Sequence, residues 1–548
     1  MSKIKIFSLG GLNEIGKNMY VVEVDNDIFV FDAGLKHADD NLLGIDYIIP
    51  SVDYLKQNVE RIKGIFITHS HDEQMGALPD IVSELKGVNI YATPFNLDII
   101  KREFEIENIP TDNLVEIQAH KKIDFGNNSV FPINVSHSVP DSVMYVLNTQ
   151  DGAIVYTGNF LFDPAMPDNY KMDIGKIAYV GKQGVLCLLC ESVYADKKGY
   201  TSPQHRASKL MTEILNKTDK RILFNVFQGQ IYRIQELLEE VKNTDKKVIV
   251  MGKKLKSVIL KAIDDKLIDF DKSRFLDIHS CNSENVIIII SDDREKPFSN
   301  INRIVSGYDK FIKLNEKDTV IFASPVYPGM EKSSTKLFDS IARIGSELVI
   351  MSSKEYLSLH ASSEDLMLMM NLLNPKYYFP VIGEYKDQVE NANCAETVGI
   401  SKENILLKLN GQVVQINDKN LVESNEIIHI DDVLIDGKTV GDVGELVIKD
   451  REILSENGVV IVSTTLDKAT KKVIAGPEIY TRGFVFVNDN KELIDGAITK
   501  ALEIIKANTK PNYIEYNKVK SQIREELGKY FYKETECNPM ILLLITEV

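Results

Sequence analysis

Apolar and polar positions along the first third of the chain predict short buried strands, most of which end at a polar residue. The clearest runs cover residues 3–9, 19–24, 28–32, 62–67, 130–135 and 153–156. Segment 77–85, which follows the fourth run, has the apolar spacing of a helix. Strands that each end in a polar loop residue are typical of a mixed sheet with an active site along one edge.

From about residue 202 to residue 351 the pattern changes to helices alternating with short apolar strands. The helical segments are 207–215, 232–241, 255–262 and 335–344, and the strands are 222–226, 247–250, 286–290 and 319–322. This alternation predicts a parallel α/β domain inserted into the first domain. The predicted boundaries are a first domain at 1–201 and 352–429, an insert at 202–351, a linker at 430–445 and a C-terminal α/β domain at 446–548. In this last domain we expect strands at 446–448, 459–463 and 540–545, and helices at 493–507 and 516–531.

The composition is that of an ordinary globular protein, but its charge limits the choice of partners. A chain of 548 residues is too long for one core. The net charge of −16 argues against a general nucleic-acid coat, so any RNA contact must be a local basic groove. The first residues do not show the apolar h-region of a signal peptide, and no apolar run reaches the roughly 18 residues that a membrane span needs. We therefore expect a cytoplasmic protein without membrane contact.

Five scattered cysteines indicate a reducing compartment rather than a disulfide framework. Cys187 and Cys190 have the spacing of half a zinc site. However, they lie in the apolar run 184–190, and an odd offset of three places two side chains on opposite faces of a strand. We therefore expect both thiols to be core residues.

The candidate chemistry begins at His69-Ser70-His71, directly after the strand 62–67. Two histidines at i and i+2 on an extended strand end project to the same side, and neutral imidazole is a good zinc ligand. The alternative is a chance pair in a polar loop.

Asp32 also ends a strand, where it is either a functional carboxylate or a turn cap. Gly11-x4-Gly16-Lys17-Asn18 is a near miss to a phosphate-binding loop, but Asn18 replaces the magnesium ligand and a strand follows.

Several longer strings resemble the ribonuclease J family over essentially the whole chain. They are Leu9-Gly10-Gly11 with Glu14–Met19, Leu43–Pro50, His137–Ser142, Gly383-Glu384-Tyr385, Ala475-Gly476-Pro477 and Arg482–Val485. The resemblance implies a metallo-β-lactamase αββα sandwich, interrupted by an inserted α/β domain called β-CASP and followed by a small C-terminal α/β domain. It also implies degradation and maturation of RNA from the 5′ end, internal cleavage, and two zinc ions in a site between the first two domains.

The resemblance assigns roles to individual residues and also shows where the chain departs from the family. His69, His71 and His137 match metal ligands, and Asp32, Glu191 and His360 match catalytic positions, with His360 in the loop that holds the scissile phosphate. Glu73 stands at an acidic position of the metal loop. Gln74 and Ile382 replace histidines, and Asn159 replaces the bridging aspartate. These departures resemble those of the second, degenerate ribonuclease J paralogue that some bacteria carry beside an active one.

The departures predict that the second metal position holds no ion. Two divalent cations roughly 3.5–4 Å apart require anionic ligands, above all a bridging carboxylate. Of the four groups that the resemblance places there, Asn159 and Gln74 are neutral, Ile382 cannot bind a metal, and only Glu73 keeps a charge, on a stem one methylene longer. We expect at most one zinc or manganese ion, bound weakly by His69, His71, His137 and Glu73; the alternative is that the histidines are remnants held by hydrogen bonds.

The expected partners are RNA and an active ribonuclease J paralogue, with a homodimer or tetramer through the C-terminal domain as a further arrangement. Gln230, Arg233, Ser358 and His360 are candidate RNA contacts, although Arg233 also fits a solvated helix charge. Residues 291–297 replace a Gly-rich phosphate loop, and Asp292 and Asp293 there would repel a 5′-phosphate.

The function we expect from the sequence is that of a structural or regulatory subunit with weak or no nuclease activity. The first alternative is a genuine 5′-to-3′ exonuclease or endonuclease of low activity. The second is a metallo-β-lactamase-fold hydrolase that acts on another substrate.

Overall fold

The computed structural model describes most of the chain and divides it into two compact units. The described residues are 2–38, 42–217, 220–227, 229–281, 283, 285–291, 298–323, 326, 331–352, 355–437, 439–440, 445–485, 490–510 and 513–548. The first unit comprises Met1–Asp40 and Ile45–Val440, and the second comprises Asn41–Gly44 and Gly441–Val548. Among the described residues, no helix combines the length and apolar character needed to cross a bilayer.

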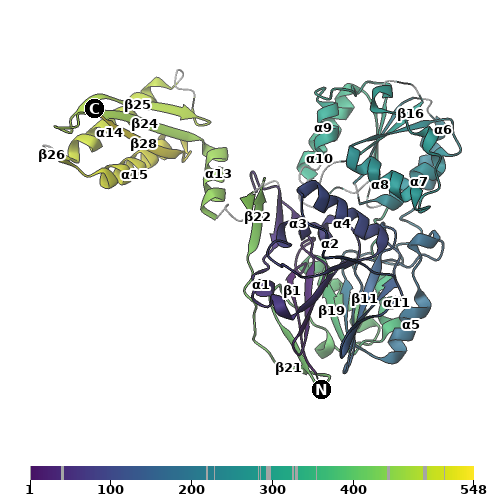
Figure 1. Cartoon of the computed structure of the whole chain (residues 1–548). Helices are drawn as coiled ribbons and strands as arrows, with labels where there is room; N and C mark the ends of the chain where they lie inside the picture. Colours follow the sequence, from purple (N-terminus) through teal and green to yellow (C-terminus); the bar gives the residue numbers. More distant parts are fainter. Residues whose placement is uncertain are drawn as a thin grey trace. The chain divides into compact units, whose positions relative to one another are not determined.

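Two β-sheets packed face to face form the base of the first unit (Figure 1). The larger sheet has the strand order β21-β20-β1-β2-β3-β6-β7-β8 and the smaller one β19-β13-β12-β11-β10-β9. The strands of the larger sheet are β21 (Asn420–Val422), β20 (Val414–Asn417), β1 (Lys3–Gly10), β2 (Met19–Val24), β3 (Asp27–Phe31), β6 (Ile62–Phe66), β7 (Ile90–Ala92) and β8 (Leu114–Glu116). Those of the smaller sheet are β19 (Tyr377–Val381), β13 (Val185–Glu191), β12 (Gly152–Tyr156), β11 (Val143–Thr149), β10 (Asn128–Asn134) and β9 (Ile123–Phe125).

Helices cover the outer face of each sheet and complete four layers. Helices α3 (Leu78–Ile81) and α4 (Pro94–Glu107) pack on the larger sheet, and α5 (Ile174–Gln183) and α11 (Ser363–Leu373) pack on the smaller one. The αββα sandwich expected from the resemblance is therefore confirmed. Successive side chains of a strand alternate between its faces, so each strand contributes both to the core between the two sheets and to the core beneath the outer helices.

Strand β13 illustrates this alternation and settles the role of its two cysteines. Cys187 packs in the core between the sheets, whereas Cys190 packs beneath the outer helices. Burial raises the pKa of the Cys187 thiol and raises that of Cys190 to about 12. The prediction that both are core residues on opposite faces is confirmed.

The inserted segment forms a parallel five-stranded sheet with helices on both faces, as expected (Figure 1). Its strand order is β15-β16-β14-β17-β18. The strands are β14 (Ile222–Asn225), β15 (Lys247–Met251), β16 (Val286–Ile290), β17 (Thr319–Phe322) and β18 (Glu347–Ile350). The helices are α6 (Ser208–Lys217), α7 (Ile231–Val241) and α8 (Lys253–Asp264) on one face, and α9 (Ser299–Val305) and α10 (Glu331–Ile344) on the other. The chain then returns to the sandwich through α11, β19 and α12 (Tyr385–Thr397).

A small sheet with the order β23-β22-β5-β4 completes the first unit. Its strands are β4 (Lys36–His37), β5 (Tyr47–Pro50), β22 (Asp432–Asp436) and β23 (Thr439–Val440).

The second unit contains a three-stranded sheet with the order β25-β24-β28. Its strands are β24 (Val459–Leu466), β25 (Val473–Arg482) and β28 (Met540–Glu547), and its helices are α13 (Glu445–Asn457), α14 (Lys491–Ala507) and α15 (Tyr516–Thr535). Helices α14 and α15 cover one face of the sheet.

Two local predictions differ from the structure. Residues 446–448 lie in helix α13 instead of a strand, because the apolar triplet continues into the charged segment Lys449–Glu452, whose residues favour a helix. Segment 77–85 contains only the four-residue helix α3 rather than one continuous helix, and the four-residue helix α2 (Asp72–Met75) precedes it.

Candidate metal centre

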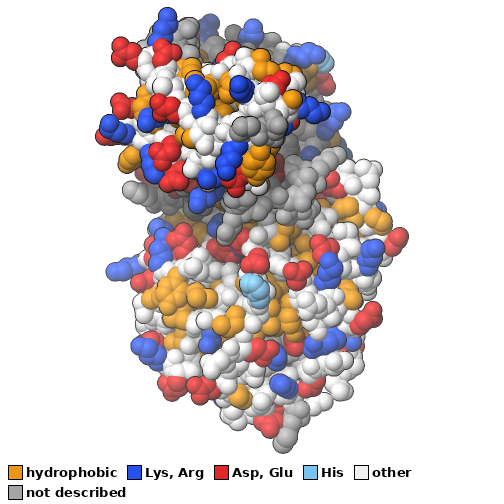
Figure 2. Space-filling model, turned by 90° about the vertical axis from the view of Figure 1, so that its left-hand side faces the viewer, with side chains coloured by type: hydrophobic (Ala, Val, Ile, Leu, Met, Phe, Trp, Pro, Cys, Tyr) orange, Lys and Arg blue, Asp and Glu red, His pale blue; other side chains and the backbone are white. Residues whose placement is uncertain are grey.

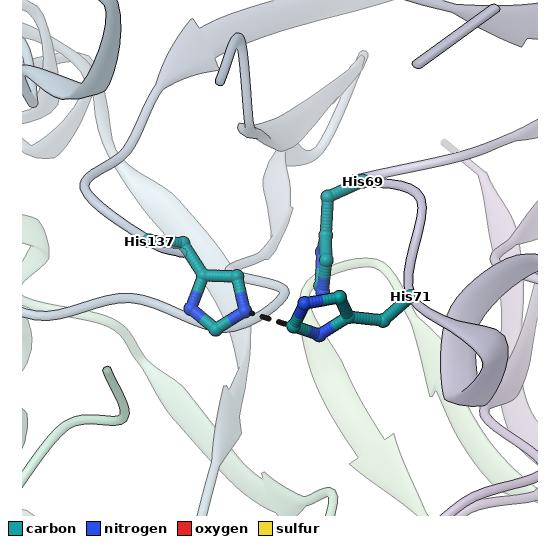
Figure 3. Close-up of side chains that lie close together, drawn as sticks. All are labelled: His69, His71 and His137. Atoms are coloured by element: carbon teal, nitrogen blue, oxygen red, sulfur yellow. Dashed lines mark hydrogen bonds between the residues drawn. The ribbon is translucent and has the colours of Figure 1, made fainter. Parts of the chain in front are cut away.

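Three histidines from two loops, one after strand β6 and one after strand β10, meet at one end of the sandwich. His69 follows strand β6, His71 precedes helix α2, and His137 follows strand β10. All three are buried, and one ring nitrogen of each lies within 4.8 Å of the others. Figure 3 shows the rings converging, with 3.4 Å between Nε2 of His137 and Nδ1 of His71. The three candidate ligands that the sequence suggested are thus brought together.

The hydrogen-bond partners of the three rings assign their tautomers. Nδ1 of His137 donates to the carbonyl oxygen of Leu359 at 2.6 Å, and Nε2 of His71 donates to that of Gly229 at 3.1 Å. The facing nitrogens, Nε2 of His137 and Nδ1 of His71, therefore both carry lone pairs. Nε2 of His69 has no hydrogen-bond partner in the described part of the chain. Three converging lone pairs without a donor fit a single cation, since neutral imidazole is the ligand form of histidine.

Burial keeps the three imidazoles in this neutral form. It lowers the pKa of His69 and of His137 well below the usual value, and neighbouring histidines lower both further. Burial also lowers the pKa of His71, although the charge of Glu73 and the bond to Gly229 oppose this effect. Glu73 lines the same pocket but is not part of the group of three.

Asp32 contacts Thr68, which in turn contacts His69, so it orients this one histidine of the three. Its carboxylate accepts the Thr68 backbone N–H at 2.8 Å and the Tyr156 hydroxyl at 2.7 Å. The Thr68 hydroxyl lies 3.0 Å from one carboxylate oxygen and 3.0 Å from Nδ1 of His69. Burial raises the pKa of Asp32 to about 7, although these hydrogen bonds oppose the effect. Asp32 is therefore a positioning residue for the His69 ring.

Backbone contacts hold helix α2 against the segment that follows strand β3. The carbonyl oxygen of Gln74 accepts the N–H of Ala33 at 2.6 Å. Next to this bond, a Cβ on Gly34 would lie 1.7 Å from the carbonyl oxygen of Glu73. Only glycine allows such a close approach of two backbone segments.

Three of the four side chains that the resemblance matches to a second metal, all except Glu73, are neutral or apolar. Gln74, Asn159 and Ile382 line the same pocket as His71. Gln74 is 1% exposed and Asn159 is 4% exposed, so neither shares its site with bulk water. A second divalent cation does not fit this set, because none of the three side chains supplies the negative charge that would offset cation repulsion.

His360 is held by a buried carboxylate at the edge of the same pocket. Its Nδ1 lies 2.8 Å from Oε2 of Glu191, and Glu191 also accepts the backbone N–H groups of Phe160 at 2.7 Å and Ala361 at 3.2 Å. The ring centroids of His360 and His137 are 5.5 Å apart. Glu191 therefore orients His360 so that Nε2 is free to act on a bound group.

The candidate RNA contacts divide into two groups. Gln230, Ser358 and His360 line the pocket, whose volume is about 670 Å³. Arg233 is buried, forms an ion pair with Glu236 and donates to the carbonyl oxygen of His205 at 2.9 Å. It would have to leave both partners to reach a phosphate. The predicted change of the 5′-phosphate loop at 292–297 lies outside the described residues.

The charge around the pocket is mainly negative. Among the described residues, seven carboxylates and three lysines line it, and two of these lysines are paired: Lys254 with Glu103, and Lys386 with Glu384 at 2.9 Å. On the face shown in Figure 2, acidic and basic side chains are interspersed, and the described residues visible there form no continuous basic stripe. A polyanion therefore gains little long-range attraction on this face.

Comparison with known proteins shows the family. The metallo-beta-lactamase superfamily matches residues 12–252, the ribonuclease J beta-CASP domain matches residues 219–341, and the ribonuclease J C-terminal domain matches residues 446–548.

Full-length relatives agree with these matches. The chain is 37% identical to Ribonuclease J2 of Bacillus subtilis, covering 100% of this chain and 99% of the relative. It is 33% identical to Ribonuclease J 2 of Staphylococcus aureus, covering 100% and 98%. A crystal structure of a protein of unknown function from Enterococcus faecalis has a TM-score of 0.54 at 14% identity, covering 76% of this chain and 100% of that one, which supports the fold alone. The chain therefore belongs to the ribonuclease J family.

Proposed function

We propose that this chain is a ribonuclease J-type protein of RNA maturation and decay that has weak or no nuclease activity of its own. The observation that carries the proposal is the second metal position, where Gln74, Asn159 and Ile382 line one pocket. In a two-metal hydrolase both ions stabilise the attacking and leaving oxygens. A centre limited to one ion loses a large part of that stabilisation, at about 1.4 kcal/mol for each tenfold in rate.

The first metal position supports binding of at most one ion, zinc or manganese. Three neutral imidazoles with an open fourth position are the ligand set of a mononuclear zinc site. An ion there would polarise a bound water or phosphate oxygen. The chain's own residues hold the site: Leu359, Gly229 and Thr68 orient the three rings.

The regulatory part of the proposal is pairing with an active ribonuclease J paralogue, or with a second copy of this chain, through the C-terminal unit. The sheet face opposite α14 and α15 carries Ile474, Tyr480 and Leu544, each more than half exposed. Apolar side chains gathered on one sheet face favour a protein contact. Charged substitutions at Tyr480 and Leu544 should lower the oligomeric mass measured by light scattering; an unchanged mass would place the contact elsewhere.

A direct test compares nuclease rate with metal content in the purified full chain. After incubation with zinc or manganese, elemental analysis should give no more than one ion per chain. The rate on 5′-monophosphorylated RNA should be about a thousandfold or more below that of an active family member. A comparable rate, or two bound ions per chain, would contradict the proposal.

The second candidate function is a genuine nuclease of low activity that uses one ion, for 5′-to-3′ exonuclease or internal cleavage. The favouring observation is that the His360–Glu191 pair remains beside the histidine group. This function predicts a residual activity that His69→Ala abolishes. Residual activity that survives His69→Ala would indicate a contaminating nuclease.

Two further expectations stay part of the proposal. The domain boundaries given by the sequence are retained, with the insert at 202–351 and the C-terminal domain at 446–548. A cytoplasmic location agrees with five cysteines that are all free.

A further inference from the structure

Four buried polar side chains at the second metal position have atoms without a hydrogen-bond partner in the described part of the chain. These atoms are Nδ2 of Asn18, Oγ of Ser70, both amide atoms of Gln74, and Oδ1 of Asn159. All four side chains are more than nine-tenths buried, and all line the pocket. A buried polar atom without a partner is unfavourable, so such a group requires a complement.

The free atoms offer both donors and acceptors and carry no charge. Oδ1 of Asn18 lies 3.2 Å from the Tyr20 hydroxyl, which leaves its Nδ2 as a donor. Gln74 offers one donor and one acceptor side by side, and Asn159 offers an acceptor. These four side chains do not supply the charged acceptors that a divalent cation needs, and a phosphate would need donors alone. The fitting ligand is a neutral group whose edge carries both kinds of atom.

The rest of the pocket narrows the class of ligand. Carboxylates such as Asp72, Glu73 and Asp387 line it and disfavour an anion. Ile15, Val193 and Phe227 also line it and add apolar surface to the pocket wall. A volume of about 670 Å³ is in the range that small organic ligands occupy.

We propose that this pocket binds an uncharged purine base, adenine by preference, through the carboxamide of Gln74. A carboxamide pairs with adenine through two parallel hydrogen bonds, accepting from the exocyclic amine and donating to a ring nitrogen. Asn18 and Asn159 supply a further donor and acceptor beside it. The inference rests on the proposed function in one respect, namely that no second cation occupies this position. RNA bound in the pocket would be a source of the base.

The test measures binding of adenosine to the full chain after treatment with a chelator, by calorimetry. Adenosine should bind saturably, and more tightly than uridine or adenosine 5′-monophosphate. Gln74→Met keeps the side chain's shape but removes both hydrogen bonds, and should weaken adenosine binding about tenfold or more. If Gln74→Met does not fold, Asn159→Leu is the second variant, and it too should weaken adenosine binding in the same measurement. The matched control is Gln57→Met, since Gln57 is an exposed amide on helix α1 (Asp53–Gln57) that does not line the pocket.

Each outcome separates this inference from the proposed function. No adenosine binding by a chain that holds at most one ion would overturn the inference alone. Two ions per chain would overturn the proposed function and the inference with it. Tighter binding of the monophosphate would identify a phosphate site instead, and undiminished binding by folded Gln74→Met would overturn the assigned location.

Discussion

The carbonyl oxygen of Gly229 accepts a hydrogen bond from Nε2 of His71 at 3.1 Å, although 158 positions separate the two residues. Gly229 belongs to the inserted segment and His71 to the sandwich. The contact turns the His71 ring so that Nδ1 faces the other two histidines, which makes the insert part of the metal centre's support. A side chain at position 229 would prevent this approach, because its Cβ would lie 2.5 Å from Cδ2 of His71.

Replacing Gly229 with alanine should therefore weaken metal binding without unfolding the chain. We expect zinc affinity, measured by competition with a chromophoric chelator, to fall about ten- to hundredfold. Gly528→Ala is the matched control, since a Cβ there would meet its nearest atom at an ordinary 3.7 Å. Equal zinc affinity in Gly229→Ala and the unaltered chain would show that the insert does not position His71.

Restoring the family's ligands should bring back the second ion. The triple variant Gln74→His, Asn159→Asp and Ile382→His supplies two imidazoles and a bridging carboxylate. We expect metal content, measured by elemental analysis, to rise from at most one ion per chain to two. The nuclease rate should increase by about a hundredfold or more. The single variant Gln74→His is the control, because it adds a ligand without the bridging charge and should leave the stoichiometry unchanged. If the triple variant binds no additional ion, electrostatics at positions 74, 159 and 382 do not limit metal binding.

The buried histidines should make the metal-free chain less stable as the pH falls. The pKa of His137 is well below its unfolded value of about 6.5, so below that pH the unfolded chain binds a proton that the folded chain does not. Its contribution to stability is present above pH 6.5 and is lost as the pH decreases. His137→Asn should flatten the pH dependence of the unfolding free energy by up to about 1.4 kcal/mol per pH unit.

Denaturant titrations between pH 5 and pH 7.5, in the presence of a chelator, measure this effect. His429→Asn is the control, because the His429 side chain is 90% exposed. A pH dependence in His137→Asn as steep as that of the unaltered chain would mean that the His137 ring is protonated in the folded state.

Asp32 should make the unfolding free energy depend on pH in the opposite direction from His137. Its pKa is about 7 in the folded chain, above the ordinary value of 3.8 that applies to the unfolded chain, so between these values the folded chain holds a proton that the unfolded chain lacks. This contribution is fully present below pH 3.8 and decreases as the pH rises toward 7. Asp32→Asn is neutral throughout and should remove it. Relative to the unaltered chain, the variant's unfolding free energy should therefore increase between pH 5 and pH 7.

The same denaturant titrations test this prediction, with Asp269→Asn as a surface control, since that side chain is 98% exposed. A constant difference between Asp32→Asn and the unaltered chain across this range would mean that Asp32 is ionised in the fold.

Local patterning was enough to predict most of the secondary structure, because a strand buried on both faces or a helix with one apolar face is visible in a short window. The bounds of strands β2 and β16 are those predicted. Helix α14 begins two residues before its predicted start, and helix α15 extends about one turn beyond its predicted end. Strand β25 was missed, since Ala475, Gly476 and Pro477 interrupt its apolar pattern. Helix α13 was predicted as a strand from three residues, too few to distinguish the two periodicities.

The candidate site was less accessible to local reasoning. Spacing identified His69 and His71, but only the resemblance added His137, because the pairing of distant strands brings it to them. The ring tautomers depend on Thr68, Gly229 and Leu359, which no motif contains. The sequence also could not predict that the Gln74 amide has no hydrogen-bond partner in the described part of the chain, because this depends on which residues the fold places around the side chain.

Ile382 has a φ of 52°, in the left-handed region that a β-branched side chain rarely adopts. Hydrogen bonds to its backbone hold this residue: the Ile382 N–H donates to the Gly11 carbonyl oxygen and to the Tyr20 hydroxyl, each at 3.1 Å, and the Ile382 carbonyl oxygen accepts from the Ser192 N–H at 2.9 Å. The loop's shape thus does not depend on which side chain it carries. A ligand could therefore be exchanged at this corner without altering the scaffold, and under the proposed function a few nucleotide changes in the gene would suffice to convert such a protein between enzyme and non-enzyme.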